Sequence, residues 1–346
     1  MALTDKRRGL RAISWFTAAA LAATFPVERA LAWGHTGHVE IGEIAADALP
    51  GAIKAVIQSP QMGAAIAEWN AELDLSKGAG QIHDFERDPG HYVDIDDAGL
   101  VLGIVPFAAM PVSRRDYDTA LRAGGQTQYG AGYLYYSLID GWQQVRKDFA
   151  WVRALTVGLK TASSNADRQF FREQLELRRW LLLRDIGVWG HYVADASQPM
   201  HVSVHYNGWG DYPNPRGYTT APIHAPFEGS FVKSFVRKRA IRTALPGYRD
   251  CRCEIEQRAH DYLTATLGTI DRTYSLASAS KDYTVANPAA VSFVTERLAA
   301  GAAQLRDMII DAWRSSASSS VGYPVINIAD IESGKVKLTR TSFWND

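Results

Sequence analysis

Apolar residues recur at helical spacing along most of the chain. They follow a largely helical rhythm between residues 38 and 49, and Pro50 ends this pattern. The same spacing predicts three longer helices, over residues 168–194, 254–277 and 288–314. No segment alternates between apolar and polar residues as a half-buried strand does. The pattern therefore predicts an all-α protein with long loops between its helices.

Changes in composition divide the chain into three expected parts. Residues 1–32 have a basic start, an apolar stretch and a final small-residue triplet ALA, which is typical of an export signal. The apolar stretch, residues 12–25, is shorter than the ~20 residues that a membrane-spanning helix needs. We therefore expect removal of this segment and no stable membrane anchor. Residues 33–313 are expected to form the all-α domain. Residues 314–346, with SSASSS and the β-prone YPVINI, are interpreted as an appendage of unknown role.

Length and charge exclude several classes of protein. The chain has 346 residues, is 47% hydrophobic and balances 37 basic against 37 acidic residues. It is therefore a folded protein, and the balanced charge excludes a polybasic binder of nucleic acid. Removal of residues 1–32 leaves a slightly acidic chain, because this segment holds more basic than acidic residues. The expected location is the periplasm or the medium outside the cell.

The only two cysteines are Cys251 and Cys253. Two cysteines are too few for a disulfide scaffold, and one intervening residue strains any bond between them. We therefore expect free thiols at these positions.

Histidines and carboxylates form spaced pairs in two segments. His191 and Asp195 are four residues apart near the end of a predicted helix, and His201 follows after a turn at Pro199. A second pair with the same spacing lies downstream, at His224 and Glu228. Either pair alone is also typical of an exposed helix pair. Together, in an exported protein, imidazole and carboxylate groups favour zinc.

Cleavage after Ala32 would make Trp33 the first residue of the mature chain. Its free α-amino group is partly neutral near pH 7, so the nitrogen and the Trp33 carbonyl oxygen could chelate a metal. The alternative is that Trp33 only begins the domain.

Four motifs in a fixed order resemble a known family. They are WGHTGH directly after the signal, HYVDIDD, the H-x3-D-x5-H pattern within HYVADASQPMH, and a later H-x3-E. This set, which spans residues 33–228, resembles the superfamily of zinc-dependent phospholipases C and single-strand-specific (type I) nucleases. The resemblance implies an exported all-α protein that holds three zinc ions in a cleft, with the N-terminal tryptophan among the ligands.

The resemblance also implies the ligands of each ion. The first zinc would take Asp74, His91, His191 and Asp195, the second would take His201, His224 and Glu228, and the third would take the amine and carbonyl of Trp33, His38 and the other oxygen of Asp195.

Asp74 departs most from the family pattern, because the usual WAD segment reads WNAELDLSK here. Asp84 and Asp88 are alternatives. Asp74 is preferred, since Lys77 follows it as a basic residue does in the family and Asp88 lies very near His91.

The implied reaction is hydrolysis of a phosphate ester. Two neighbouring zinc ions lower the pKa of a bridging water and polarise the phosphoryl oxygen, and a third stabilises the leaving oxygen. Asp74 is the predicted catalytic residue, which orients or deprotonates the attacking water.

Two substrate classes fit this reaction. The short interval between Trp33 and His38, the long loop between His201 and His224, and HYVDIDD resemble the nucleases, whereas the phospholipases use glutamate at the position of Glu228. We therefore expect single-stranded nucleic acid as the substrate, with a phospholipid headgroup such as phosphatidylcholine as the alternative.

The loop HYNGWGDYPNPRGY offers rings at Tyr206, Trp209 and Tyr212. They could stack on an unpaired base or enclose a choline group, or they could simply pack beneath the loop.

A third hypothesis is a non-catalytic zinc-binding protein of the cell envelope, with residues 314–346 docking a partner. Structural zinc sites are usually closed and rich in cysteine, whereas this set holds histidines and carboxylates. An enzyme is therefore the favoured interpretation.

Overall fold

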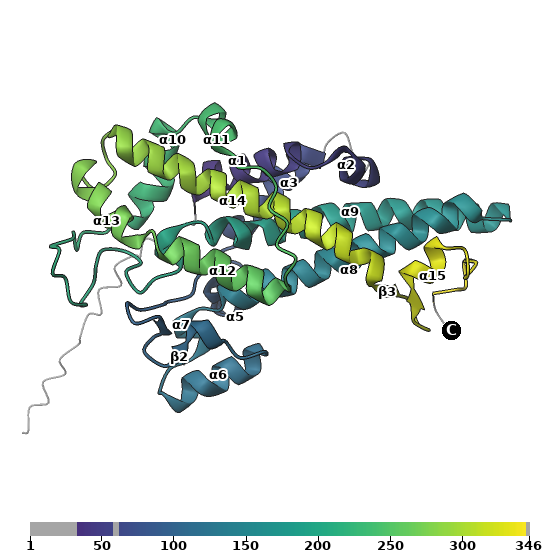
Figure 1. The fold of residues 1–346 in the computed structure, drawn as a ribbon, viewed down its shortest axis with the longest axis horizontal. Coiled ribbons are helices and arrows are strands. Elements are labelled where there is room, and N and C mark those ends of the chain that lie inside the picture. The colour runs from purple at the N-terminus through teal and green to yellow at the C-terminus, as the bar shows by residue number, and fades with distance from the viewer. Residues whose placement is uncertain (1–32, 58–61, 344–346) are drawn as a thin grey trace, which may run out of the picture. The chain divides into compact units, whose positions relative to one another are not determined.

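The computed structural model describes residues 33–57 and 62–343, and helices make up 66% of it (Figure 1). This confirms the all-α expectation. The helices are α1 (Gly34–Asp47), α2 (Gly51–Ile57), α3 (Met62–Asn70), α4 (Glu72–Leu75), α5 (Gln81–Arg87), α6 (Arg114–Ala123), α7 (Gln128–Ala131), α8 (Leu134–Thr161), α9 (Asn165–Asp195), α10 (Phe231–Phe235), α11 (Lys238–Ala244), α12 (Ile255–Leu267), α13 (Ile270–Ala279), α14 (Pro288–Ser315) and α15 (Ile328–Glu332). The expected export signal lies outside the described residues. None of the helices described here is long and apolar enough to cross a membrane.

The few strands form two short antiparallel hairpins. In the first, β1 (Leu100–Val101) pairs with β2 (Val105–Pro106), and in the second, β3 (Ser320–Val321) pairs with β4 (Ile326–Asn327). Leu100 faces Pro106 in the first register, and Ser320 faces Asn327 in the second. Hairpins of this length add little to a core, so the helices determine the fold.

The core lies among the five helices α1, α3, α8, α9 and α14, which pack on one another (Figure 1). α8 and α9 are joined by a short turn, in which the Ser164 hydroxyl caps α9 by accepting from the Asp167 N–H. Gly141 of α8 lies directly against Trp189 of α9, where an added Cβ would come within 2.0 Å of the indole ring. A side chain at Gly141 would therefore force these two helices apart.

The segment after α14 lies against α8. Arg153 of α8 holds it through hydrogen bonds to the Ser316 hydroxyl at 2.8 Å and the Glu332 carboxylate at 2.8 Å, and it also donates to the carbonyl of Trp313, within α14, at 3.0 Å. Near the end of the described chain, the Phe343 ring packs edge-on against Trp151.

The cysteine expectation was wrong, because Cys251 and Cys253 form a disulfide. Their Cα atoms are 5.1 Å apart, which lies within the range that a disulfide spans. The intervening Arg252 has a φ of 50°, and this left-handed backbone brings the two cysteines together despite their short separation.

Two carboxyl groups meet between α8 and α9. The Nε2 of Gln144 donates to Asp148 at 3.1 Å and to Asp185 at 3.4 Å. Burial and the neighbouring Asp185 carboxylate raise the pKa of Asp148 to about 7. The folded state therefore favours protonated Asp148, and this contribution to stability is lost as pH rises from about 4 through about 7.

We expect Asp148→Asn to be more stable than the wild-type protein at pH 8, by ~2 to 4 kcal/mol, because asparagine carries no charge to bury. At pH 4 the two proteins should have similar stability. Denaturant unfolding at both pH values measures this, with Asp140→Asn, an exposed aspartate of the same helix, as the matched control. A constant difference across this pH range would contradict the prediction.

Candidate metal centre

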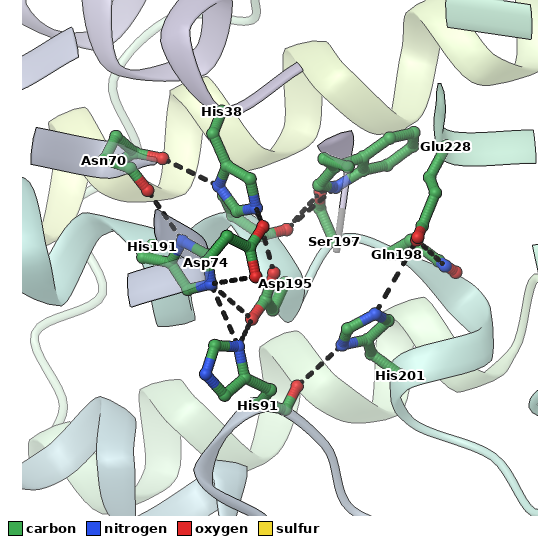
Figure 2. Close-up of polar contacts among 12 residues, drawn as sticks. His38, Asn70, Asp74, His91, His191, Asp195, Ser197, Gln198, His201 and Glu228 are labelled. Atoms are coloured by element: carbon green, nitrogen blue, oxygen red, sulfur yellow. Dashed lines mark hydrogen bonds and ion pairs between the residues drawn. The ribbon is translucent and has the colours of Figure 1, made fainter. Parts of the chain in front are cut away.

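Histidines and carboxylates from several separate segments converge at the ends of α1, α4 and α9 (Figure 2). His38 lies on α1, Asp74 on α4, and His191 and Asp195 on the last turn of α9. The other four lie on or beside short helical turns at Asp88–His91, Pro199–His201 and Pro226–Ser230; they are His91, His201, His224 and Glu228.

Asp195 occupies the middle of the first group. Its Oδ2 lies 3.0 Å from His91 Nδ1 and 3.3 Å from His191 Nε2, and its Oδ1 lies 3.4 Å from His38 Nε2. The Asp195 side chain is fully buried. One carboxylate therefore presents its two oxygens to histidines from three elements.

Asp74 joins the same group. Its Oδ1 lies 3.9 Å from His191 Nε2, and its Oδ2 lies 3.9 Å from His38 Nε2. The Lys77 ammonium donates to Oδ1 at 2.7 Å. The alternative Asp84 instead accepts from the Gly78 N–H at 2.9 Å. The structure therefore brings Asp74 to the histidines. Neither Asp84 nor Asp88 belongs to the groups of converging donor atoms found among the described residues.

The second group is smaller. His201 Nε2 and His224 Nε2 are 3.1 Å apart, and Glu228 Oε2 lies 2.8 Å from His224 Nε2. The amide Nε2 of Gln198 reaches the same atoms, at 2.9 Å from His224 Nε2 and 3.1 Å from Glu228 Oε2. Three possible metal donors thus meet within a buried space.

Backbone carbonyls fix the orientation of three histidine rings. The Nδ1 atoms of His191, His201 and His224 each lie 2.7 Å from a main-chain oxygen, of Asn70, His91 and Tyr206 respectively. A carbonyl oxygen only accepts, so each Nδ1 carries a proton. In the neutral ring, each Nε2 then directs a lone pair into the cluster, which is the arrangement of a metal-binding histidine.

Four buried polar atoms of the cluster find no hydrogen-bond partner among the described residues. They are His38 Nε2, Asp74 Oδ2, Asp195 Oδ1 and Glu228 Oε1. Leaving buried polar atoms unsatisfied is costly, and cations bound within the two groups would remove this cost. Three groups, His38–Asp74–His191, His91–His191–Asp195 and His201–His224–Glu228, each bring three donor atoms within 4.8 Å of one another. The residues present therefore fit metal ions.

The charges within the cluster reinforce this fit. Burial opposes ionisation of Asp195, but His191 and His201 outweigh it and hold the pKa of Asp195 well below its ordinary value. Burial also lowers the pKa of His201, but Asp195 and Glu228 more than compensate and raise it to about 9. Metal binding must then displace a proton from His201, so affinity will fall as pH decreases below about 9.

Trp33 lies beside the first group. Its indole Nε1 donates to the Ala194 carbonyl at 2.9 Å and to the Ser197 hydroxyl at 2.8 Å, and these residues flank Asp195. Its own carbonyl accepts from the Gly37 N–H at 3.1 Å. Coordination by the Trp33 amine stays a prediction, because it depends on cleavage next to a segment outside the described residues.

The three aromatic residues of the loop differ in exposure. Tyr206 is 57% exposed and Tyr212 is 40% exposed, whereas Trp209 is only 5% exposed. The Trp209 ring stacks on His205 with a centroid distance of 3.6 Å and packs against Tyr274. Trp209 therefore packs beneath the loop, the alternative that the sequence left open, and substrate contact by the loop stays a prediction. Tyr206 and Tyr212 remain available.

Two buried amides, Asn70 and Gln198, contact the cluster although no sequence pattern singled them out. Gln198 lies within the HYVADASQPMH motif, and its place between predicted ligands could have identified it. Asn70 lies within the WNAELDLSK segment, but nothing there indicates its contacts, which join parts of the chain that are distant in sequence.

Comparisons with known proteins found no matching family model, no matching curated protein and no matching solved structure. The fold and the site together define an all-α protein whose buried histidines and carboxylates could hold metal ions.

We expect zinc to raise the thermal unfolding midpoint of metal-free protein. A ligand at 100 times its Kd stabilises the native state by ~2.7 kcal/mol for each site, which corresponds to a shift of ~4 °C per site for a chain of this size. Differential scanning fluorimetry measures the shift. Magnesium, which prefers oxygen ligands, is the control and should have little effect. Equal midpoints with and without zinc would contradict the prediction.

Proposed function

We propose that this chain is an exported zinc-dependent phosphodiester hydrolase, a nuclease that acts on single-stranded nucleic acid. The observation that supports it most is the convergence of eight side chains of the motif set, from separate segments, into buried groups of donor atoms. The same resemblance supports a fold of the phospholipase C and type I nuclease kind, with three zinc ions.

The proposed reaction adds water to phosphorus and breaks one P–O ester bond, which leaves a phosphate monoester and an alcohol. When bound, the metal ions supply Lewis acidity and lower the pKa of the attacking water. Asp195 orients the histidines of the first group through its two carboxylate oxygens. Glu228 and His224 hold the second group, with their donor atoms 2.8 Å apart.

Asp74 is the proposed residue that orients the water and accepts its proton. Lys77 already occupies its Oδ1 at 2.7 Å, while Oδ2 is buried and finds no hydrogen-bond partner among the described residues. Oδ2 is thus the atom at which a proton could be received.

The exposed rings of Tyr206 and Tyr212 are suited to stacking on unpaired bases. The Tyr206 carbonyl accepts from His224 Nδ1 at 2.7 Å, so this residue directly adjoins the second group. Exposed aromatic rings stack on unpaired bases, whereas bases within a duplex are already stacked. Glu228 supports the alternative, a phospholipase C, because that branch uses glutamate at this position.

Hydrolysis assays on three substrates test the proposal. Zinc-loaded protein beginning at Trp33 is given single-stranded DNA, the same sequence as a duplex, and phosphatidylcholine vesicles. We expect nucleotide release from single strands, slower cleavage of the duplex and no diacylglycerol. Release of diacylglycerol alone would identify a phospholipase C, and no hydrolysis of any substrate would favour a non-catalytic zinc protein.

Substitution of the two tyrosines sharpens the test. Stacking on one base is worth ~1–3 kcal/mol, so Tyr206→Ala with Tyr212→Ala should lower kcat/KM for single-stranded DNA by at least ~10-fold. Tyr323→Ala, which removes a 77% exposed tyrosine from the β3–β4 turn, is the matched control and should leave kcat/KM unchanged.

A further inference from the structure

Asn70 contacts two histidines that belong to different predicted metal positions. Its side-chain Oδ1 lies 3.0 Å from His38 Nδ1, and its main-chain oxygen lies 2.7 Å from His191 Nδ1 (Figure 2). Both oxygens accept, so both histidines carry their proton on Nδ1 and direct Nε2 toward the carboxylates. The two imidazole rings stack with centroids 3.9 Å apart and an interplanar angle of 9°.

The surroundings of Asn70 leave it little freedom. Asn70 ends α3, is fully buried, and lies between α1 and α9. A Cβ added at Gly42 of α1 would come within 3.2 Å of the Asn70 Cβ, and one added at Gly190 of α9 would come within 2.4 Å of its Nδ2. Helices on both sides thus approach the amide closely because these two positions are glycine.

The other end of each histidine meets one carboxylate. His38 Nε2 lies 3.4 Å from Asp195 Oδ1, and His191 Nε2 lies 3.3 Å from Asp195 Oδ2. Each of the two rings therefore contacts Asn70 through Nδ1 and Asp195 through Nε2. The Nδ1 atom of His38, however, contacts the side chain of Asn70, whereas that of His191 contacts the Asn70 main-chain oxygen.

We infer that Asn70 is a positioning residue whose side chain orients His38 for metal binding, while its main-chain oxygen orients the neighbouring His191. This inference rests on the metal ions of the proposed function. It assigns the Asn70 side chain to His38 alone, so a substitution at residue 70 weakens the His38 position and spares the others.

The test measures zinc binding by three variants, with zinc as the only added ligand. Asn70→Leu and Asn70→Ala remove the acceptor, whereas Asn70→Asp keeps an oxygen in the same place. We expect Asn70→Asp to bind as much zinc as the wild-type protein, and the other two to bind the zinc at His38 at least ~10-fold more weakly. Elemental analysis after dialysis and competition with a chelator provide stoichiometry and affinity. Asn287→Ala, which removes the side-chain cap of α14, controls for general loss of stability.

Full stoichiometry and unchanged affinity in Asn70→Leu or Asn70→Ala would overturn the inference. A second measurement needs no variant: the ¹⁵N chemical shifts of His38 in zinc-loaded wild-type protein should show a protonated Nδ1 and a metal-bound Nε2, and the reverse pattern would overturn it. These outcomes can be distinguished from the outcomes that test the proposed function. Zinc binding as expected without hydrolysis would contradict only the function, and no zinc binding by the wild-type protein would contradict both.

Discussion

Replacing Asp195 by asparagine will lower phosphodiester hydrolysis by ~10³-fold or more. The Asp195 carboxylate is the only group that faces His38, His91 and His191 together among the described residues, so its loss removes charge from two metal positions. Loss of several kcal/mol of transition-state stabilisation corresponds to about three orders of magnitude in rate. Steady-state kinetics on single-stranded DNA, with zinc content measured on the same samples, provide the test.

Asp307→Asn is the matched control for this substitution. Asp307 is as deeply buried as Asp195 and contacts Arg306 at 2.6 Å, but it lies outside the converging groups. We expect Asp307→Asn to keep its zinc and its rate of hydrolysis at a temperature where it is folded. Equal activity in Asp195→Asn and the wild-type protein would show that the cluster is not the catalytic centre.

Protein that keeps Ala32 before Trp33 will lose most of its activity, on the order of 10²-fold. An amide nitrogen has no free lone pair for a metal, whereas the α-amino group of a first residue does. Loss of a direct ligand costs at least as much as loss of a residue that only orients one, which is typically ~10–100-fold. The Trp33 indole anchors this end beside Asp195, since it donates to Ala194 and Ser197.

The comparison uses two proteins that differ by one residue. One begins at Trp33 and the other at Ala32, and a third with an alanine added after Asp346 controls for an altered terminus. Zinc content should fall by one ion in the extended protein alone. Equal zinc content and equal rates would instead support the alternative that Trp33 only begins the domain.

The sequence predicted some helices closely because their apolar residues recur at helical spacing over long stretches. Residues 168–194 and 288–314 correspond to α9 and α14, and Asn287 caps α14 directly before Pro288. The predicted helix over residues 254–277 is interrupted near Gly268 and forms α12 and α13. α8 was not predicted, although its buried residues Leu134, Leu138, Trp142 and Val145 also recur at helical spacing.

In the candidate site, pairs of residues close in sequence could be predicted, whereas contacts between distant residues could not. Pairs such as His224 and Glu228 are visible in the sequence because they are four residues apart. The contacts of Asn70 span 32 residues to His38 and 121 residues to His191, so only the fold reveals them. The burial of Trp209 is likewise tertiary, since Tyr274 covers it from a different element.

Anomalous diffraction at the zinc edge, from crystals of protein beginning at Trp33, tests the central claim most directly. We expect three peaks, one among Asp74, His91, His191 and Asp195, one among His201, His224 and Glu228, and one beside Trp33 and His38. Peaks only at surface positions, or none within the cluster in crystals grown with zinc, would contradict the claim that these residues form a metal centre.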